Sequence, residues 1–337
     1  MNEEKNVENQ QGIRIVKEAQ VPFDLGGNRF DQIATELFND YSRSRIQSWI
    51  KEGALKVDGQ IIKPKEKLFG GEVVTLDIVI EAQEDHEAQE MALDIVYEDS
   101  SIMIVNKPAG LVVHPAVGNR DGTLMNAILH HAPETAHIPR AGIVHRLDKE
   151  TTGLMVVAKT LIAQTDLVSQ LQERSMGREY EAISIGVMTG GGVVNEPIGR
   201  HPHNRQKQAV EPLHGKDAVT HYRLVERFKN HTHIRLKLET GRTHQIRVHM
   251  AFIQYPLIGD PQYGGRLKMP KACTPELQGQ LRNFRRQALH AKRLELSHPV
   301  TGEWMEWEVD LPDDMKRLLE ALKADTLESD SSDSEYF

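Results

Sequence analysis

The stretch GIVHRLDKETTGLMVVAKT, residues 142–160, sets one carboxylate between two apolar segments. The residues before His145 are strand-like, and LMVVA at 154–158 is a second apolar run. Between the two runs stand His145, Arg146 and Asp148, all of which can carry charge. The pattern predicts two core strands joined by a turn that presents Asp148 beside an arginine.

The length and composition are those of a globular protein with room for two domains. The chain has 337 residues, of which 39% are hydrophobic and 27% charged. It holds no run of 18 apolar residues, and its N-terminus lacks the apolar core of a signal peptide. The single cysteine, Cys273, excludes an internal disulfide and a cysteine-based zinc site. We therefore expect a cytoplasmic protein with no membrane partner.

The net charge of −8 is distributed unevenly. Residues 81–100 carry eight acids and no Lys or Arg, and the segment from 311 onward carries eight acids and three bases. Residues 101–310, in contrast, carry 27 bases and 20 acids. The basic middle of the chain permits a polyanionic partner without requiring one.

A small module is expected near the N-terminus. Residues 28–41 place apolar side chains at helical spacing, and Ser42 or Ser44 can cap a second short helix. The runs LKV and QII on either side of Asp58-Gly59 predict a β-hairpin with a two-residue turn.

One face of this module is predicted to be basic. The basic residues of the second helix are Arg43, Arg45 and Lys51, and those after the hairpin are Lys63, Lys65 and Lys67. A solvated helix face and a nucleic-acid-binding face are equally compatible with these charges.

The rest of the chain predicts an α+β fold with a largely antiparallel sheet. Strand-like runs are DIVYED, SIMIVNKP and GLMVVAK, and clean alternation follows near residue 232. Helical patterns are fewer and cover 161–174, 244–253 and 312–323. Strands and helices do not alternate regularly along the chain, so the pattern does not predict a parallel sheet.

Two acidic segments are expected to lie outside this core. The acidic stretch around residues 81–91 has few apolar side chains to bury, so we predict a linker there. The polar, acidic residues 326–337 predict a disordered tail.

Asp148 is the strongest candidate for a chemical role. A carboxylate on a turn between apolar strands can act as a nucleophile or general base, and a nearby arginine would keep it ionised. A structural ion pair or a turn-capping aspartate explains the same spacing, and the spacing alone favours that reading.

A second cluster of charged residues is ETGRTHQIRVHM at 239–250. A glycine after a strand and Thr243 as a possible N-cap predict a strand that turns into a helix. On this helix Arg247 could reach inward to a buried carboxylate or face the solvent.

The histidines do not indicate a metal site. His201 and His203, and His231 and His233, form HxH pairs, but the i, i+4 spacing with an intervening Glu of zinc proteases is absent. No Lys-Ser/Thr follows TGGGVV to complete a phosphate-binding loop.

Several motifs in order resemble the RluA family of pseudouridine synthases. HRLDKETTG (145–153) is preceded by NKPAGLVVHP and followed by REYEA (178–182) and TGRTHQIRVH (240–249). PLIGDPQYGG (256–265) and LHAKRLELSHP (289–299) extend the likeness. RFDQ, SRSRIQSWI and VDG near the N-terminus resemble an S4 RNA-binding domain. The resemblance covers roughly residues 20 to 325.

The resemblance implies roles for individual residues. Asp148 would be the catalytic aspartate and Arg247 its partner. Arg146 would enter the RNA stack as the target uridine leaves it, and Tyr180 would stack on the flipped uracil. The S4 face with Arg43, Arg45 and Lys51 would bind RNA.

The resemblance also implies the organisation and the activity. An S4 domain at 20–80 would precede the linker 81–91 and a mainly antiparallel, mixed-sheet catalytic domain at 92–325. The enzyme would isomerise uridines of 23S ribosomal RNA, in the helix 69 hairpin, without metal or cofactor and as a monomer. A non-catalytic RNA-binding or assembly factor and a metal-dependent hydrolase are the alternatives.

Overall fold

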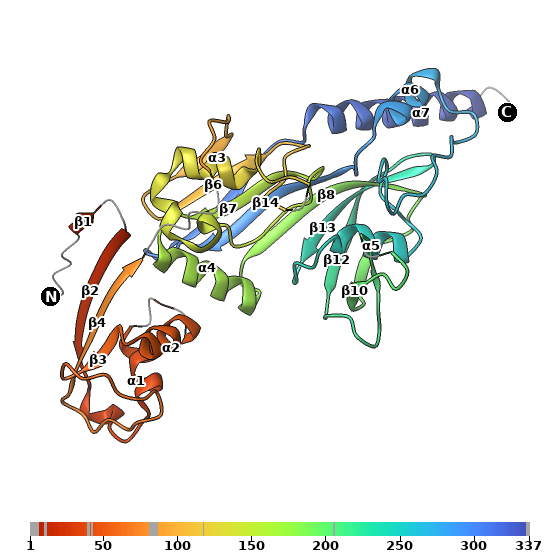
Figure 1. Cartoon of the computed structure of the whole chain (residues 1–337). Coiled ribbons are helices and arrows are strands. Elements are labelled where there is room, and N and C mark those ends of the chain that lie inside the picture. Colours follow the sequence, from red (N-terminus) through yellow and green to blue (C-terminus); the bar gives the residue numbers. More distant parts are fainter. Residues whose placement is uncertain are drawn as a thin grey trace.

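The computed structural model describes residues 7–9, 12–38, 41, 43–80, 87–116, 118–204 and 206–334. A small N-terminal domain with its own sheet is followed by a larger α+β domain built on a nine-stranded sheet (Figure 1). Among the described residues, no helix is long and apolar enough to cross a membrane.

The N-terminal domain is a four-stranded antiparallel sheet covered by two helices. The strands are β1 (Val7–Asn9), β2 (Gly12–Gln20), β3 (Leu55–Val57) and β4 (Val73–Ile80), in the order β1-β2-β4-β3. A short 3-10 helix, Phe23–Leu25, precedes α1 (Phe30–Leu37) and α2 (Arg43–Glu52). The predicted apolar stripes of both helices are buried against the sheet, with Ile33, Ile46 and Ile50 almost fully enclosed.

The predicted hairpin is only partly correct. Asp58 and Gly59 both have positive φ, and Val57 and Gln60 exchange two backbone hydrogen bonds, so the turn forms as expected. The QII run, however, is not a strand, and β3 pairs with β4 instead. The longer β4 offers buried apolar partners, Leu76 opposite Leu55 and Val74 opposite Val57, which the three-residue run lacks.

The second half of the predicted linker lies against the larger domain. Residues 81–86 are outside the described residues. The backbone of Gln89 donates to the carbonyl of Asn126, and its side chain accepts from the Gly122 N–H at 2.7 Å. Polar groups rather than apolar side chains anchor this segment, which is why hydrophobicity alone marks it as a linker.

The sheet of the larger domain is mixed and mainly antiparallel, as predicted. Its order is β5-β6-β7-β14-β8-β13-β12-β9, with β15 beside β14, and among the strands that the structure describes only β7 and β14 pair in parallel. The strands are β5 (Ile95–Glu98), β6 (Ile102–Lys107), β7 (Thr152–Ala158), β8 (Gly177–Ile185), β9 (Gly192–Asn195), β12 (Val219–Arg227), β13 (His231–Leu238), β14 (Leu289–Ser297) and β15 (Trp304–Glu308). A separate two-stranded ribbon joins β10 (Ile198–Arg200) to β11 (Gln208–Val210).

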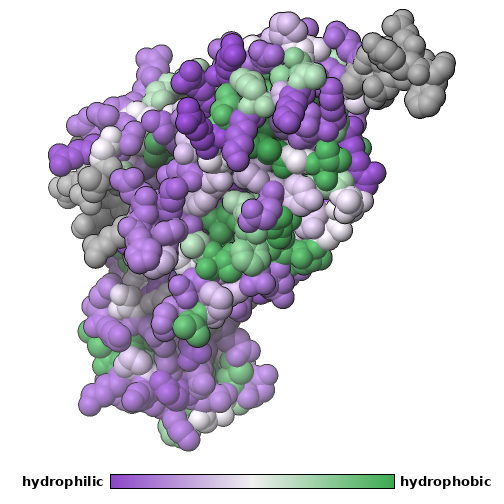
Figure 2. All heavy atoms as spheres, turned by 90° about the vertical axis from the view of Figure 1, so that its right-hand side faces the viewer, coloured by the Kyte–Doolittle hydropathy of each residue, from purple (hydrophilic) through white to green (hydrophobic). Residues whose placement is uncertain are grey.

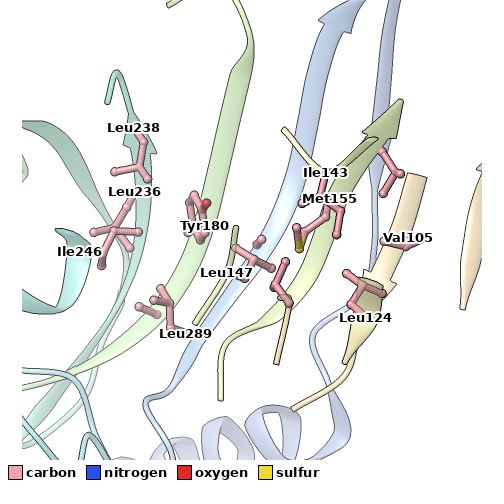
Figure 3. Close-up of a cluster of buried hydrophobic side chains, with 14 of the residues drawn as sticks. Val105, Leu124, Ile143, Leu147, Met155, Tyr180, Leu236, Leu238, Ile246 and Leu289 are labelled. Carbon is pink, nitrogen blue, oxygen red and sulfur yellow. The ribbon is translucent and has the colours of Figure 1, made fainter. Parts of the chain in front are cut away.

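Helices cover both faces of the sheet. They are α3 (Leu124–His131), α4 (Leu161–Glu173), α5 (Gln245–Phe252), α6 (Pro275–Asn283) and α7 (Asp313–Ser334), with 3-10 turns at Pro133–His137 and Pro139–Gly142. The core under α3 and α5 includes Tyr180 (Figure 3). The core under α4 lies on the opposite face of the sheet. On the side of α5, α6 and α7 the surface is mostly hydrophilic, and the most extensive cluster of apolar side chains lies near the middle of the view (Figure 2).

The segment before Asp148 is not the strand that the sequence predicts. Residues 139–142 form a 3-10 turn, and Ile143 makes only an isolated bridge to Val157. Positive φ at Arg140, Ala141 and Gly142 turns the backbone away from an extended path. Asp148 therefore lies between a loop and β7 rather than between two strands.

Gly153 in the opening stretch is required by the parallel pairing of β7 with β14. Its φ is 111°, and a Cβ atom would lie 2.2 Å from the carbonyl oxygen of Ala291. The glycine allows the close approach that places β7, and hence the Asp148 loop, beside β14.

The C-terminal helix is longer than predicted. The sequence predicts a helix at 312–323 and a disordered tail from 326, but α7 continues to Ser334, and residues 335–337 are outside the described residues. Asp325 accepts from the Thr274 N–H at 2.6 Å, and Thr326 accepts from the Lys229 N–H at 3.2 Å. These contacts hold the helix beyond the end of its apolar pattern.

Candidate active site

A cavity of about 580 Å³ opens on the sheet face that carries Tyr180. The loop 143–148 forms one wall, β8 contributes Arg178 and Tyr180, and the segment 238–247 from the end of β13 into α5 closes the other side. All four residues of the larger domain that the sequence singled out, Asp148, Arg146, Tyr180 and Arg247, line this cavity. Tertiary structure thus brings together residues up to about a hundred positions apart.

The loop that carries Asp148 is held from below by a buried lysine. Lys107, 1% exposed, donates from Nζ to the carbonyls of Pro108, Leu111 and Lys149 at 2.8 to 3.0 Å. Burial lowers the pKa of Lys107 to about 8, an effect opposed by the nearby Glu150 and Asp148 carboxylates. Since Lys149 follows Asp148 directly, this contact fixes the backbone next to the candidate carboxylate.

Arg247 pairs with Asp148, the partner that the resemblance implies. Its Nη1 donates to Asp148 Oδ2 at 2.8 Å, while its Nε and Nη2 form a two-pronged pair with Asp260 at 2.7 and 2.9 Å. Nη2 also donates to Gln262 at 3.1 Å. Burial alone would lower the pKa of Arg247, but the two carboxylates raise it above its ordinary value. Arg247 is therefore a fixed cation that orients Asp148.

Asp260 is a site residue that sequence reasoning missed. Its side chain is fully enclosed and accepts from Arg247 and from the backbone N–H groups of Gln262 and Tyr263. Burial would raise the pKa of Asp260, but these donors hold it below its usual range. The only signal was PLIGDPQYGG, which counted toward the resemblance but carried no assigned role.

His244 completes the surroundings of Asp148. Its Nε2 lies 3.8 Å from Asp148 Oδ1, and its Nδ1 contacts the Tyr263 hydroxyl at 2.8 Å. Burial lowers the pKa of His244 despite the Asp148 carboxylate. The prediction of Thr243 as N-cap is wrong, because His244 takes that position with a φ of 58° and α5 begins at Gln245.

Tyr180 forms part of the cavity floor. It is 6% exposed and lies among Leu147, Leu236 and Leu289 (Figure 3). Burial raises the pKa of its phenol, so the ring is neutral at physiological pH. A neutral aromatic ring beside a carboxylate suits a planar, uncharged ligand such as a base.

Arg146 differs from the other three, because it is exposed at the cavity mouth. The three basic residues predicted on the N-terminal domain are not at the cavity. Arg43 and Lys51 are exposed on α2, and Arg45 is partly buried with its guanidinium 5.7 Å from the Trp49 ring. Burial lowers the pKa of Arg45.

His145, the histidine of the opening stretch, has a structural part. Its Nε2 accepts from the Val156 N–H at 3.0 Å, and burial lowers its pKa to about 3. The ring is therefore neutral and ties the loop to β7. In the part of the chain that the structure describes, no three His, Cys, Asp or Glu side chains gather as a metal site.

Both domains of the chain are similar to known proteins. Residues 101–252 match the RNA pseudouridylate synthase family, and residues 29–74 match the S4 domain. "Ribosomal large subunit pseudouridine synthase D" of Pseudomonas aeruginosa is 58% identical over 92% of this chain and 97% of its own length. The Escherichia coli (strain K12) protein of the same name is 58% identical over 89% of this chain and 92% of its own length. Human RNA pseudouridylate synthase domain containing 4 superposes with a TM-score of 0.54 at 26% identity, covering 68% of this chain and 92% of that one.

Proposed function

The chain belongs to the RNA pseudouridylate synthase family, and we propose that its substrate is the 23S RNA of the large ribosomal subunit. The observation that carries this proposal is 58% identity, over nearly the full length, to relatives named for the large subunit. The helix 69 hairpin is the proposed target within that RNA. We also propose that the enzyme works in the cytoplasm and as a monomer.

In this proposal Asp148 is the catalytic residue. Pseudouridine forms when the bond between N1 and C1′ breaks, the uracil turns, and C5 bonds to C1′. C5 then loses its proton, and N1 ends with a proton in place of the sugar. The carboxylate can begin by adding to the base, by adding to C1′ or by removing the proton of C2′. Each route needs an ionised and oriented carboxylate, which the 2.8 Å bond from Arg247 supports.

The uridine must leave the RNA helix to reach Asp148. Extrusion of a base costs a few kcal/mol, which contacts to the flipped base and the backbone must offset. We propose that Tyr180 stacks on the flipped uracil. Arg146 enters the RNA stack at the position that the uridine leaves. The exposure of Arg146 at the cavity mouth and the burial of Tyr180 at its floor support these two different roles.

The N-terminal domain, for which we propose the bounds 20–80, is assigned a share of RNA binding. The exposed Arg43 and Lys51, with Arg45 beside Trp49, provide charge for phosphates. The catalytic domain is proposed to span 92–325. Leu161 at the start of α4 packs against the core of the N-terminal domain, which links the two.

Replacement of the carboxylate tests the catalytic role. Asp148→Asn keeps the shape but removes the negative charge, so we expect RNA binding to persist and pseudouridine formation to be abolished. Product is measured by chemical mapping of 23S RNA that was made without this enzyme. The control is Asp121→Asn, a change of an exposed aspartate, which should leave the activity intact.

Two outcomes would contradict the proposal. Residual product with purified Asp148→Asn would refute the role of this carboxylate. Pseudouridines that persist in helix 69 in cells lacking the gene would refute the assigned target.

A further inference from the structure

The cavity contains a second buried arginine, which the roles assigned above do not use. Arg178 lies on β8 two residues before Tyr180, so both side chains project from the same face of the strand. It lines the cavity and is only 6% exposed. Buried cations are rare unless they are paired, so this position calls for a physical reason.

Arg178 has no carboxylate partner among the residues that the structure describes. Its Nη2 makes one long hydrogen bond, 3.4 Å to the carbonyl oxygen of Glu239, and its buried Nε has no hydrogen-bond partner. Burial lowers the pKa of the guanidinium, which nevertheless stays charged. The folded protein thus keeps a desolvated positive charge without the counter-charge that would stabilise it.

The residues around Arg178 provide no counter-charge and leave space beside its guanidinium. The Glu239 carboxylate is occupied by Arg174 at 2.9 Å and by His221 at 2.6 Å. His145 also offers Arg178 no counter-charge, because burial and the charge of Arg178 lower the pKa of its ring to about 3. A Cβ atom on Gly241 would lie 2.8 Å from Arg178 Nη1, so the glycine of the TGRTH motif leaves that space free of a side chain.

We propose that Arg178 binds a phosphodiester group of the RNA next to the flipped uridine. A guanidinium matches the two oxygens and the charge of a phosphate, whereas a base carbonyl would leave the charge uncompensated. Residues i and i+2 of a strand are about 6.6 Å apart, a separation comparable to that between a base and its phosphate. Arg178 therefore holds the backbone while Tyr180 contacts the base. This assignment rests on the proposed RNA substrate.

The first test measures affinity as a function of salt. Arg178→Met should weaken binding of a helix 69 hairpin by about 10- to 100-fold, the effect of one charged hydrogen-bonding group. The slope of log affinity against log salt should become less steep by about 0.7 to 0.9, the value for one lost phosphate contact. Arg178→Lys, which keeps the charge, should recover most of the slope.

A structural role predicts a different result. Because Arg178→Met removes an unpaired buried charge, the melting temperature of the free protein should stay the same or rise. The matched control, Arg235→Met, removes an arginine that is bonded to buried Glu181 at 2.6 Å, and it should lower the melting temperature. A lower melting temperature for Arg178→Met with an unchanged salt slope would overturn the proposal.

The second test identifies the group on the RNA. Hairpins with a single neutral methylphosphonate at each linkage around the target uridine are compared on the wild-type protein and on Arg178→Met. At one linkage the methylphosphonate should weaken binding by the wild-type protein but leave the affinity of Arg178→Met unchanged. This result would show that the two changes remove the same contact. Equal sensitivity of both proteins at every linkage would refute the phosphate assignment.

Gly241→Ala provides an independent variant in case Arg178→Met does not fold. The added methyl group fills the space in front of Nη1, so it should reproduce the loss of affinity at the same linkage. Wild-type product formation on the unmodified hairpin separates the two hypotheses. If the wild-type protein forms no product on this hairpin, the proposed RNA target is rejected. If the wild type forms product normally and the variants bind the RNA as tightly as the wild type does, only the role of Arg178 is rejected.

Discussion

Two arginines border the same cavity and are buried almost equally, Arg178 at 6% exposure and Arg247 at 4%. Arg247 bonds to two carboxylates, Asp148 and Asp260, whereas Arg178 forms no ion pair with any residue described in the structure. Equal burial with unequal pairing separates two uses of the same side chain. The paired arginine orients a carboxylate, and the unpaired one retains a charge that a ligand can neutralise.

Buried histidines show a third way to accommodate a basic group. His231 and His290 are buried, and burial lowers the pKa of each to about 4. They lose their proton at physiological pH and so avoid an unpaired charge. An arginine cannot do this, which makes the isolated Arg178 unusual within the same domain.

The largest effect should come from removal of the paired arginine. Arg247→Met leaves Asp260 buried without its cation and Asp148 without its hydrogen bond, so the free energy of unfolding should fall by about 3 to 5 kcal/mol. Urea unfolding measures this loss. Arg178→Met should show no comparable loss, and equal destabilisation of the two variants would remove the distinction between them.

The buried histidines should make stability sensitive to acid. Between pH 6.5 and about 4 the unfolded chain binds a proton at His231 and His290 that the folded chain does not, so stability falls as the pH falls. Each histidine contributes up to about 1.4 kcal/mol per pH unit. Urea unfolding at several pH values measures the slope, which His231→Leu should reduce and His203→Gln, at an exposed position, should not. An unchanged slope in His231→Leu would contradict this assignment.

The smallest effect should come from an exposed ion pair at the Arg178 end of the cavity. Arg174 bonds to Glu239 at 2.9 Å, but the two side chains are 45% and 35% exposed. Arg174→Met should therefore change the free energy of unfolding by less than about 1 kcal/mol. A larger loss in urea unfolding would mean that pairing, rather than burial, determines how much each of these arginines contributes to the free energy of unfolding.

Much of the fold could be predicted because its signals are local. Apolar spacing located α1, α2 and α4, and the alternation of Ile234, Leu236 and Leu238 located β13. The Asp58-Gly59 turn also formed as predicted. The predicted strand partner of β3, the QII run, was wrong. Pairing depends on which segment, however distant in the sequence, buries the strand better.

The site could be predicted only in part. The ordered motifs indicated Asp148, Tyr180 and Arg247 and thus the residues that line the cavity. They did not indicate Asp260, whose importance lies in its bonds to Arg247, or Arg178, whose importance lies in a missing partner. A contact, or its absence, has no signature in the spacing of residues along the chain.

The amino-acid sequence alone was sufficient for the family, the α+β class and most helices, because periodicity, turn residues and motifs act within a few positions. Only the folded chain decides how buried charges are distributed. Asp148 and Arg247 are 99 positions apart, and the sheet brings them to 2.8 Å. The same packing leaves Arg178 without a carboxylate, since desolvation and pairing depend on three-dimensional neighbours.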